Sequence, residues 1–433
     1  MGLGGGTYLV QNKTLPGAYI NFISAARASA TLSDRGYAAM ALELDWGVDG
    51  EMFTIENGDF QKDSLKILGY DYSHEKLKGL RDLFCNAKTL YAYRLNSGNK
   101  AVNPFATARY SGIRGNDIKI MISANVDEPT KFDVVTLMEN TKVDIQTVAE
   151  AAELKDNNFV VFKKDGVLQE TAATPLAGGT NGQTTGASYQ AFLDKAEAYS
   201  FNTLGCLSKE ESIKGLFVAF TKRLRDEMGI KFQTVLFNKA AADYEGIINL
   251  KNKVTDGEET SLVYWLTGAT AGCAVNKSIA NKEYNGEFLV DTAYKQSQYA
   301  EALDAGEFVF HKIGDEVRVL DDINSFVSVT TDKNEDFASN QVIRVIDQIG
   351  NDIAVLFNTR YMGKVQNNES GRIAFWNDLV SYNKQMEQIQ AIENFVSDEL
   401  IVKKGNDKKS VVVVNPVTPV CAMTKLYMTV VVE

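Results

Sequence analysis

The chain has 433 residues, of which 45% are hydrophobic and 23% are charged, and its formal net charge at pH 7 is −11. That length exceeds what one hydrophobic core usually organises, so we expect roughly two to four domains. The negative balance, without any basic stripe, excludes nucleic acid as a partner, because phosphate binding needs a surplus of Lys and Arg.

The sequence indicates a reduced, cytosolic folding environment. The first residues lack the charged and apolar regions of a secretion signal, and Gly6 breaks the myristoylation pattern. No apolar run approaches the length that spans a bilayer, so we expect no direct membrane insertion. The four cysteines are far apart and form no CxxC pair, which argues against a zinc site or a disulfide framework; they are Cys85, Cys206, Cys273 and Cys421.

Residues 1–25 are predicted to form an extended arm. Tyr8–Val10 can form a short strand, and Ala18–Ile23 alternates, with Ile20 and Phe22 on one side. Residues 26–96 then mix strands with a helix. Their strands are predicted over Tyr37–Leu44 and Thr89–Leu95, and Ser73 is predicted to cap the helix between them.

From residue 97 to 177 the pattern changes to short strands, typical of a small inserted β-rich domain. Ile118, Ile120 and Ile122 line one face of a strand, and a brief helix is predicted over Thr147–Leu154. The glycine-rich stretch 176–182 is read as a linker at a domain boundary.

Strands and helices alternate through residues 178–335. Strands are predicted at 203–207, 232–237 and 246–250. The first helix is predicted to begin with a capping box at Ser208 and to end at Gly229, and Thr260–Val275 forms the next. This alternation predicts a parallel or mixed sheet with both faces covered.

The last segment, 336–433, is predicted to be an α+β domain. A strand at Ile323–Val329 leads into it, a helix is capped by Ser339 and ended by Gly350, and a long amphipathic helix spans Ser370–Phe395. Strands follow at 396–402 and 411–414, with lysines as charged gatekeepers in the turn between them.

The terminal stretch Thr424–Val432 has the alternation of a pleated strand. Its first face carries Leu426, Met428, Val430 and Val432. A strand at this position is an aggregation hazard unless its edge is covered. Two readings stay open at this point: an ordinary strand in its own sheet, or a strand donated to the sheet of another subunit.

We find no catalytic, cofactor-binding or metal-binding constellation. His74 is read as a surface residue at a helix start and His311 as an exposed hairpin residue, without a nucleophile elbow near either. The glycines Gly268 and Gly272 lack the Lys-Ser/Thr of a phosphate loop, so we read them as small residues that let another element approach closely. Asp321-Asp322 is read as a solvated turn rather than a calcium loop.

Several blocks, in their order and spacing, resemble the sheath proteins of contractile tails in bacteriophages, phage-like elements and R-type bacteriocins. The resemblance runs nearly end to end. It is carried by Pro16-Gly17-Ala18-Tyr19, Gly115-Asn116-Asp117-Ile118, Leu176-Ala177-Gly178-Gly179, Ile323-Asn324-Ser325-Phe326, Arg344-Val345-Ile346-Asp347, Tyr361-Met362-Gly363-Lys364-Val365, Gly371-Arg372 and Lys425-Leu426-Tyr427-Met428-Thr429-Val430.

The resemblance implies a multidomain α/β and α+β protein: a central α/β sheet unit, an inserted small β-rich domain and a C-terminal α+β domain with exchanged terminal strands. It implies a helical homopolymer of stacked, hexameric rings around an inner tail tube protein, with baseplate and tail terminator proteins as further partners. The interface arms would include Tyr8, Val10, Tyr19, Ile20, Phe22, Leu426, Met428, Val430 and Val432, and the tube-facing candidates are Lys364, Arg372 and Lys384.

The expected function is therefore that of a non-enzymatic subunit that contracts from a metastable extended state and drives the tube through a cell envelope. It would assemble in the bacterial cytoplasm and then form part of a released phage tail or tail-like particle. Two alternatives remain: a static self-assembling shell protein, and a hydrolase on the central α/β unit.

Overall fold

The computed structural model describes residue 32 and residues 34–239 and 242–432. Among them, two compact units are distinguished. The C-terminal unit consists of residues 352–384 and 396–416, and the main unit holds the other described residues from 34 onward. The predicted N-terminal arm, with Tyr8, Val10, Tyr19, Ile20 and Phe22, lies outside the described residues.

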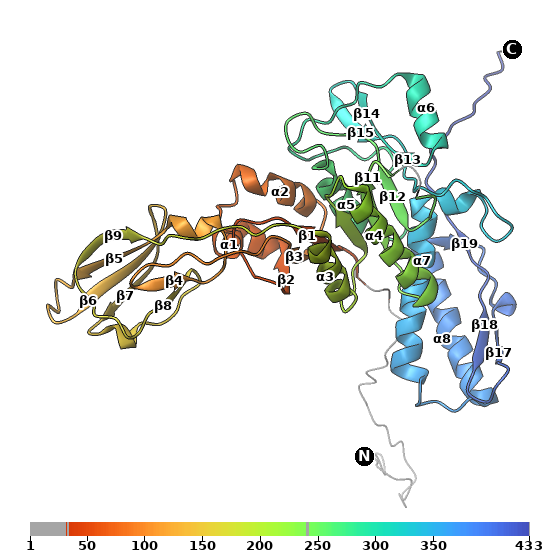
Figure 1. Cartoon of the computed structure of the whole chain (residues 1–433). Helices are drawn as coiled ribbons and strands as arrows, with labels where there is room; N and C mark the ends of the chain where they lie inside the picture. The colour runs from red at the N-terminus through yellow and green to blue at the C-terminus, as the bar shows by residue number, and fades with distance from the viewer. Residues whose placement is uncertain (1–31, 33, 240–241, 433) are drawn as a thin grey trace, which may run out of the picture. The chain divides into compact units, whose positions relative to one another are not determined.

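A seven-stranded sheet forms the centre of the main unit (Figure 1), in the order β13-β12-β11-β10-β1-β3-β2. All neighbouring strands are parallel except β2 and β3, which are antiparallel. The strands are β1 Tyr37–Leu42, β2 Met52–Glu56, β3 Thr89–Arg94, β10 Thr203–Cys206, β11 Gln233–Phe237, β12 Ile247–Leu250 and β13 Glu307–Phe308. The predicted covered, mixed sheet is confirmed.

The sheet is covered on both faces because its central strands are apolar on both sides. In β1, Ala38 and Met40 pack into one hydrophobic cluster, while Ala39 and Ala41 pack into the other. The first cluster also contains side chains of α1, α2 and α5, and the second contains those of α3 and α4. These helices are α1 Asn57–Leu68, α2 Lys78–Phe84, α3 Gly186–Ala196, α4 Glu211–Lys222 and α5 Leu262–Gly272.

Two predicted helix caps are wrong. His74, not Ser73, stands at the start of the short 3-10 turn Glu75–Leu77 before α2, and its side chain accepts a hydrogen bond from the Lys76 backbone N–H. Helix α4 begins after Glu210 without a side-chain cap, because Ser208 lies two residues before the cap position and accepts from the Glu210 N–H at 3.2 Å. The predicted stop at Gly229 is confirmed by its positive φ of 75°.

The small residues of α5 allow a close approach to α2. A Cβ on Gly268 would lie 2.2 Å from the Leu83 carbonyl oxygen, and one on Gly272 would lie 2.0 Å from that of Asn86. Both distances are far inside van der Waals contact, so only glycine fits at either position. The interpretation of these glycines as a packing feature is confirmed.

The segment between β3 and α3 folds as a small β-sandwich with its own core (Figure 1). It has a four-stranded sheet in the order β7-β6-β5-β9 and a separate pair β4-β8. The strands are β4 Ala106–Ala108, β5 Ile118–Ala124, β6 Phe132–Met138, β7 Thr141–Val148, β8 Val160–Phe162 and β9 Thr171–Pro175. The predicted helix over Thr147–Leu154 is wrong, since its first residues extend β7 and only Ala151–Glu153 forms a 3-10 turn.

The chain enters and leaves this sandwich at one crossing. Val102 and Ala177 exchange two backbone hydrogen bonds, at 2.8 and 3.0 Å. A Cβ on Gly179 would lie 2.4 Å from the Gly112 carbonyl oxygen, so the glycine-rich stretch packs tightly. Trp46, which follows β1 and is fully buried, contributes to the sandwich core and contacts Tyr110 edge-on at 5.2 Å.

The remainder of the main unit includes α6 Gln296–Asp304 and the hairpin β14 Phe310–Ile313 and β15 Glu316–Val319. The predicted strand at Ile323–Val329 is wrong: Ile323 forms only an isolated bridge with Ser339, and the Asn324 side-chain amide donates to the Phe337 carbonyl oxygen in a 3-10 turn. Asp322 is not in a solvated turn either: it is buried and pairs with the buried Arg344.

Helix α7 spans Asn340–Leu356, so the predicted end at Gly350 is wrong. Gly350 lacks a positive φ, and the helix continues through it for more than one turn. Helix α8 spans Glu369–Gln388 and stops before the predicted Phe395. The last strands are β16 Ile392–Glu393, β17 Ile401–Lys404, β18 Val411–Val414 and β19 Thr418–Pro419. The mixed, multidomain fold class expected from the sequence is confirmed.

Candidate assembly site

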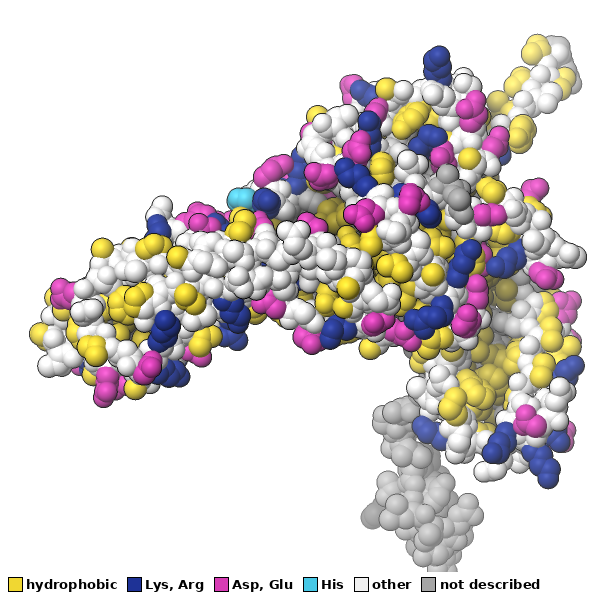
Figure 2. Space-filling model, in the orientation of Figure 1, with side chains coloured by type: hydrophobic (Ala, Val, Ile, Leu, Met, Phe, Trp, Pro, Cys, Tyr) yellow, Lys and Arg dark blue, Asp and Glu magenta, His cyan; other side chains and the backbone are white. Residues whose placement is uncertain are grey.

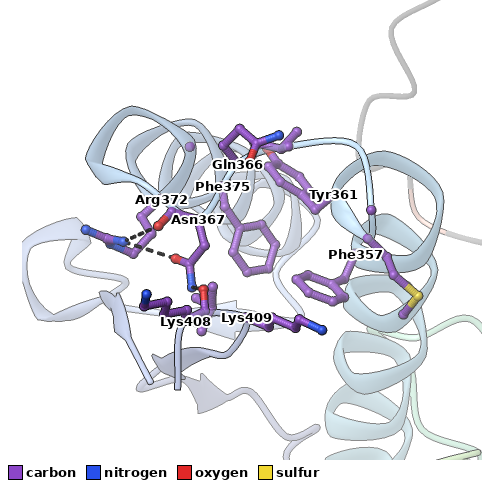
Figure 3. A pocket seen from close by; sticks show the side chains of 13 residues that line it. Phe357, Tyr361, Gln366, Asn367, Arg372, Phe375, Lys408 and Lys409 are labelled. Carbon is purple, nitrogen blue, oxygen red and sulfur yellow. Dashed lines mark hydrogen bonds between the residues drawn. The ribbon is translucent and has the colours of Figure 1, made fainter. Parts of the chain in front are cut away.

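The C-terminal unit has a pocket of about 410 Å³ between the end of α7, the start of α8 and the β17–β18 turn (Figure 3). Three aromatic rings form its apolar side: the ring centroid of Tyr361 lies 4.7 Å from that of Phe375, which lies 5.6 Å from that of Phe357. The lining residues include three cations and no carboxylate; the cations are Arg372, Lys408 and Lys409. This chemistry suits an acidic group attached to an apolar surface.

Asn367 joins the two sides of the pocket. Its side-chain amide donates hydrogen bonds to the carbonyl oxygens of Lys408 (3.1 Å) and Ser410 (2.8 Å), and its own oxygens accept from Arg372. A Cβ on Gly371 would lie 2.1 Å from the Gln366 carbonyl oxygen, so the tight turn into α8 requires glycine. Figure 3 shows the hydrogen bonds by which Asn367 holds the Arg372 guanidinium.

An ion pair supports the aromatic side. The Tyr361 hydroxyl donates to Asp378, which also pairs with Arg360 at 2.5 Å. Burial, with the hydrogen bond to Asp378, raises the pKa of Tyr361, so its phenol stays neutral. These contacts orient the ring toward Phe375 without adding net charge to the pocket.

The three tube-facing candidates do not form one cluster. Arg372 lines the pocket, and Lys364 is exposed in the preceding turn, where its ammonium donates to the Thr359 carbonyl oxygen at 2.6 Å. Lys384 is exposed on α8 twelve residues after Arg372, which at 1.5 Å per residue is about 18 Å along the helix. No described residue pairs with its ammonium group.

The two-stranded hairpin β17–β18 leaves apolar side chains uncovered. Ile401 pairs with Val414 and Lys403 with Val412, which places these side chains on one face. Ile401, Val412 and Val414 are 46%, 41% and 46% exposed. Figure 2 shows hydrophobic side chains over these strands and basic ones at the tip of the unit. A two-stranded sheet this open is marginal by itself and has two edges available for pairing.

The terminal stretch forms no strand in the single chain. The four residues predicted to share one face are exposed: Leu426 84%, Met428 73%, Val430 71% and Val432 89%. Among the described residues, this stretch therefore does not form an ordinary strand within its own sheet. The residues just before this stretch, in contrast, bond to the main unit. Strand β19 pairs with β16, and the Ala422 N–H donates to the Gln341 side chain at 2.9 Å.

The two histidines, which a hydrolase would need, each contact another aromatic ring. The exposed His74 stacks on Tyr70 with ring centroids 4.2 Å apart, and His311 lies in the β14–β15 hairpin as expected, although it is only partly exposed. Burial and the nearby Arg318 lower the pKa of His311. Within the described residues, no group of three or more His, Cys, Asp and Glu side chains could hold a metal ion. No described helix has both the length and the apolarity to cross a membrane.

Comparison with known proteins assigns most of the chain from residue 35 onward. Four family models match successive segments: the tail sheath protein Gp18 domain III N-terminal region (35–95), the phage tail sheath protein beta-sandwich domain (96–181), the phage tail sheath protein central domain (182–325) and the phage tail sheath C-terminal domain (332–433). The chain is also 34% identical to the phage-like element PBSX protein XkdK of Bacillus subtilis (strain 168), over 98% of this chain and 99% of that protein.

The chain belongs to the phage tail sheath protein family. A crystal structure of a sheath tail protein from Desulfitobacterium hafniense superposes with a TM-score of 0.81 at 38% identity, covering 93% of this chain and all of that one. The family resemblance expected from the sequence is confirmed.

More distant sheath proteins share the fold. The helical sheath of the anti-feeding prophage in its contracted state matches 97% of this chain and 99% of its own, with a TM-score of 0.55 at 13% identity. In the present chain, the C-terminal pocket is lined by residues of two sequence blocks that carried the family resemblance, including Tyr361, Gly363 and Arg372. Sequence reasoning missed the aromatic side, although Phe357 and Tyr361 are spaced i, i+4 on one helical face.

Proposed function

We propose that this sheath protein is the subunit of a contractile tail sheath. It polymerises helically around an inner tail tube and shortens from a metastable extended state, which drives the tube through a target cell envelope. The observation that carries the proposal is the exposed, strand-patterned terminal stretch on a chain that matches sheath proteins over nearly its whole length. The shared fold with a contracted sheath supports it.

The termini act as exchanged arms. The N-terminal segment 1–25 and the alternating face of residues 424–432 add strands to neighbouring copies, where main-chain hydrogen bonds hold while the bodies between them rotate. Contacts that join different surfaces and do not close produce an open helix, here of stacked hexameric rings. The proposed core consists of residues 26–96 and 178–335, the inserted domain of residues 97–177, and the C-terminal domain of residues 336–433.

Contraction proceeds without ATP, so the contracted lattice must bury more surface than the extended one. An extra few hundred Å² per subunit, at about 25 cal/mol per Å², releases several kcal/mol before opposing costs. Many subunits contribute along a tail. A non-enzymatic role follows, since the work comes from packing.

The inner tail tube meets the sheath through the C-terminal unit. Lys364, Arg372 and Lys384 are the tube-facing cations, and the aromatic pocket beside Arg372 supports this choice because it offers positive charge next to an apolar surface. Baseplate and tail terminator proteins cap the ends of the polymer. Nucleic acid is not a partner. Assembly takes place in the bacterial cytoplasm, and the product is a phage tail or tail-like particle.

The decisive experiment is assembly of the purified chain on its inner tube, imaged by electron microscopy before and after a mild urea or acid trigger. A contractile sheath gives a long, narrow lattice that converts into a shorter, wider one. A single lattice under both conditions would favour the static shell protein and contradict the proposal.

A charge-reversal arm of the same experiment tests the tube-facing side. Lys364→Glu with Lys384→Glu should lower co-sedimentation with tube severalfold, because both ammonium groups are exposed. Arg372 is left intact since it also bonds to Asn367. Lys164→Glu, exposed in a turn of the inserted sandwich, is the matched control and should co-sediment normally.

A further inference from the structure

The main unit has a cleft of its own, at the carboxyl end of the parallel strands of the central sheet. Ala41 and Glu43 reach it from the end of β1, and Leu207 and Ser208 from the end of β10. These neighbouring strands mark the switch point of the sheet, since β3 lies on one side of β1 and β11 on the far side of β10. Open α/β sheets bind ligands at this position. The cleft volume of about 680 Å³ suits a small organic ligand.

The charges in the cleft do not favour the anions that such crevices often hold. Each of its three lysines is already paired with a carboxylate: Lys78 with Asp256 at 2.8 Å, Lys209 with Glu258 at 3.3 Å, and Lys76 with Asp45 at 3.6 Å. The carboxylates of Glu43 and Glu210 also line the cleft, and neither forms a hydrogen bond or ion pair with any described residue. The cleft therefore has an unbalanced negative charge.

Two hydroxyl groups in the cleft also lack partners. The buried Oγ1 of Thr184 has no hydrogen-bond partner among the described residues, although buried polar atoms nearly always have one. No described group bonds to the Tyr264 hydroxyl. Burial and, next, the charge of Glu43 raise the pKa of Tyr264, which places that carboxylate near a neutral phenol. A ligand with several N–H donors would satisfy these acceptors together.

Apolar walls complete the cleft. Leu95, Leu207 and Ile213 line it together with the rings of Tyr264 and Phe288. The Lys78 ammonium lies 4.6 Å from the centroid of the Phe288 ring, so this wall already accommodates one cation. A ligand that is cationic at one end and apolar along its stem matches both parts.

We propose that this cleft binds an organic cation, namely a guanidinium or ammonium group on a short apolar stem. The cationic head lies at Glu43 and Glu210, and the stem lies along the aromatic wall. Such a group is supplied either by a free small molecule or by an Arg or Lys side chain of a second copy.

Isothermal titration of the unassembled full chain with butylguanidinium tests the proposal, and butylurea is the neutral probe of the same shape. Saturable binding of butylguanidinium, at least about tenfold tighter than butylurea, is expected. Glu43→Gln and Glu210→Gln should each weaken it about fivefold, since each removes one exposed charge and preserves the side-chain shape. Glu170→Gln, exposed on the inserted sandwich, is the control and should bind as the parent does.

Equal affinity for the two probes would overturn the proposal without any variant, and so would unchanged affinity in the double Gln variant. Repeating the titration on assembled polymer distinguishes the sources. Binding that disappears on assembly assigns the cleft to a side chain of a neighbouring copy, and binding that persists assigns it to a free cation. The readout does not depend on contraction, so it stands or fails separately from the sheath function.

Discussion

Asp82 is a carboxylic acid held inside the main unit. Its side chain is fully buried and accepts hydrogen bonds from the Tyr284 hydroxyl and, at 2.7 Å, from the Glu287 N–H. Burial raises its pKa from 3.8 to about 6, because the hydrogen bonds only partly compensate for lost hydration. The folded chain therefore binds a proton at a pH where the unfolded chain has lost it.

This predicts a specific loss of stability as the pH rises. The contribution of Asp82 is fully present below its unfolded pKa and is lost as the pH rises through about 6, a change of about 2 to 3 kcal/mol. Asp82→Asn should remove this part of the pH dependence between about pH 4 and pH 7, measured as the difference in unfolding midpoints. Asp71→Asn, at an exposed position, should keep the dependence of the parent. Parallel curves for parent and Asp82→Asn would refute the assignment.

At the assembly site, the sequence predicted some residues and missed others. Arg372 and Lys364 were found because they are basic residues in an acidic chain and lie within a family block. The role of Asn367 was not predictable, since its hydrogen bonds reach residues about forty positions away, at Lys408 and Ser410. Long-range contacts of this kind leave no local pattern.

Among the elements, the contact between α2 and α5 depends on two missing side chains. Gly268→Ala would place a Cβ 2.2 Å from the Leu83 carbonyl oxygen, where backbone must move. We expect the unfolding free energy to fall by about 1–3 kcal/mol, the usual range for overpacking. Urea or thermal unfolding of the purified chain measures it.

The matched control is Gly215→Ala in α4. Nothing lies within 4 Å of a Cβ at that helical position, so alanine should be neutral or stabilise by about 0.5–1 kcal/mol. The two substitutions are chemically identical, and opposite signs are expected. A Gly268→Ala variant as stable as Gly215→Ala would show that α2 and α5 separate easily.

Element prediction succeeded where one periodic pattern decided the outcome. The central strands of the sheet are buried on both faces and have continuous apolar runs, which predicted β1, β3, β10, β11 and β12, whereas β2 and β13 at its edges were not predicted. It failed where polar side chains bond to irregular backbone, as at Asn324, and where a glycine is tolerated inside a helix, as at Gly350. The Thr424–Val432 pattern is that of a strand, but a strand needs a neighbour, and the described residues provide none there.

For the whole molecule, the exposed terminal stretch separates folding from assembly. Deleting residues 424–433 removes the apolar side chains of Leu426, Met428, Val430 and Val432, which the described residues leave exposed, whereas the contacts of Ala422 and β19 stay. The truncated chain should therefore keep its melting temperature and remain a soluble monomer that forms no tubes. Normal sheath from this variant, seen by electron microscopy, would contradict arm exchange.

Point variants refine this test, because the two faces of the stretch differ. Met428→Asp alters the apolar face and should block assembly, whereas Thr429→Asp alters the opposite face and should be tolerated better. Equal effects would mean that the stretch does not pair as a strand.

The doubly bonded crossing of Val102 and Ala177 has an evolutionary consequence. The chain leaves the core and returns to it at one point, so the segment beyond that point is an insertion, whose core also receives Trp46 from the scaffold. Mutation can reshape, enlarge or exchange this appendage without altering the register of a single strand in the central sheet. Lineages can thus diversify what this part of the particle presents while the machinery beneath it is inherited unchanged.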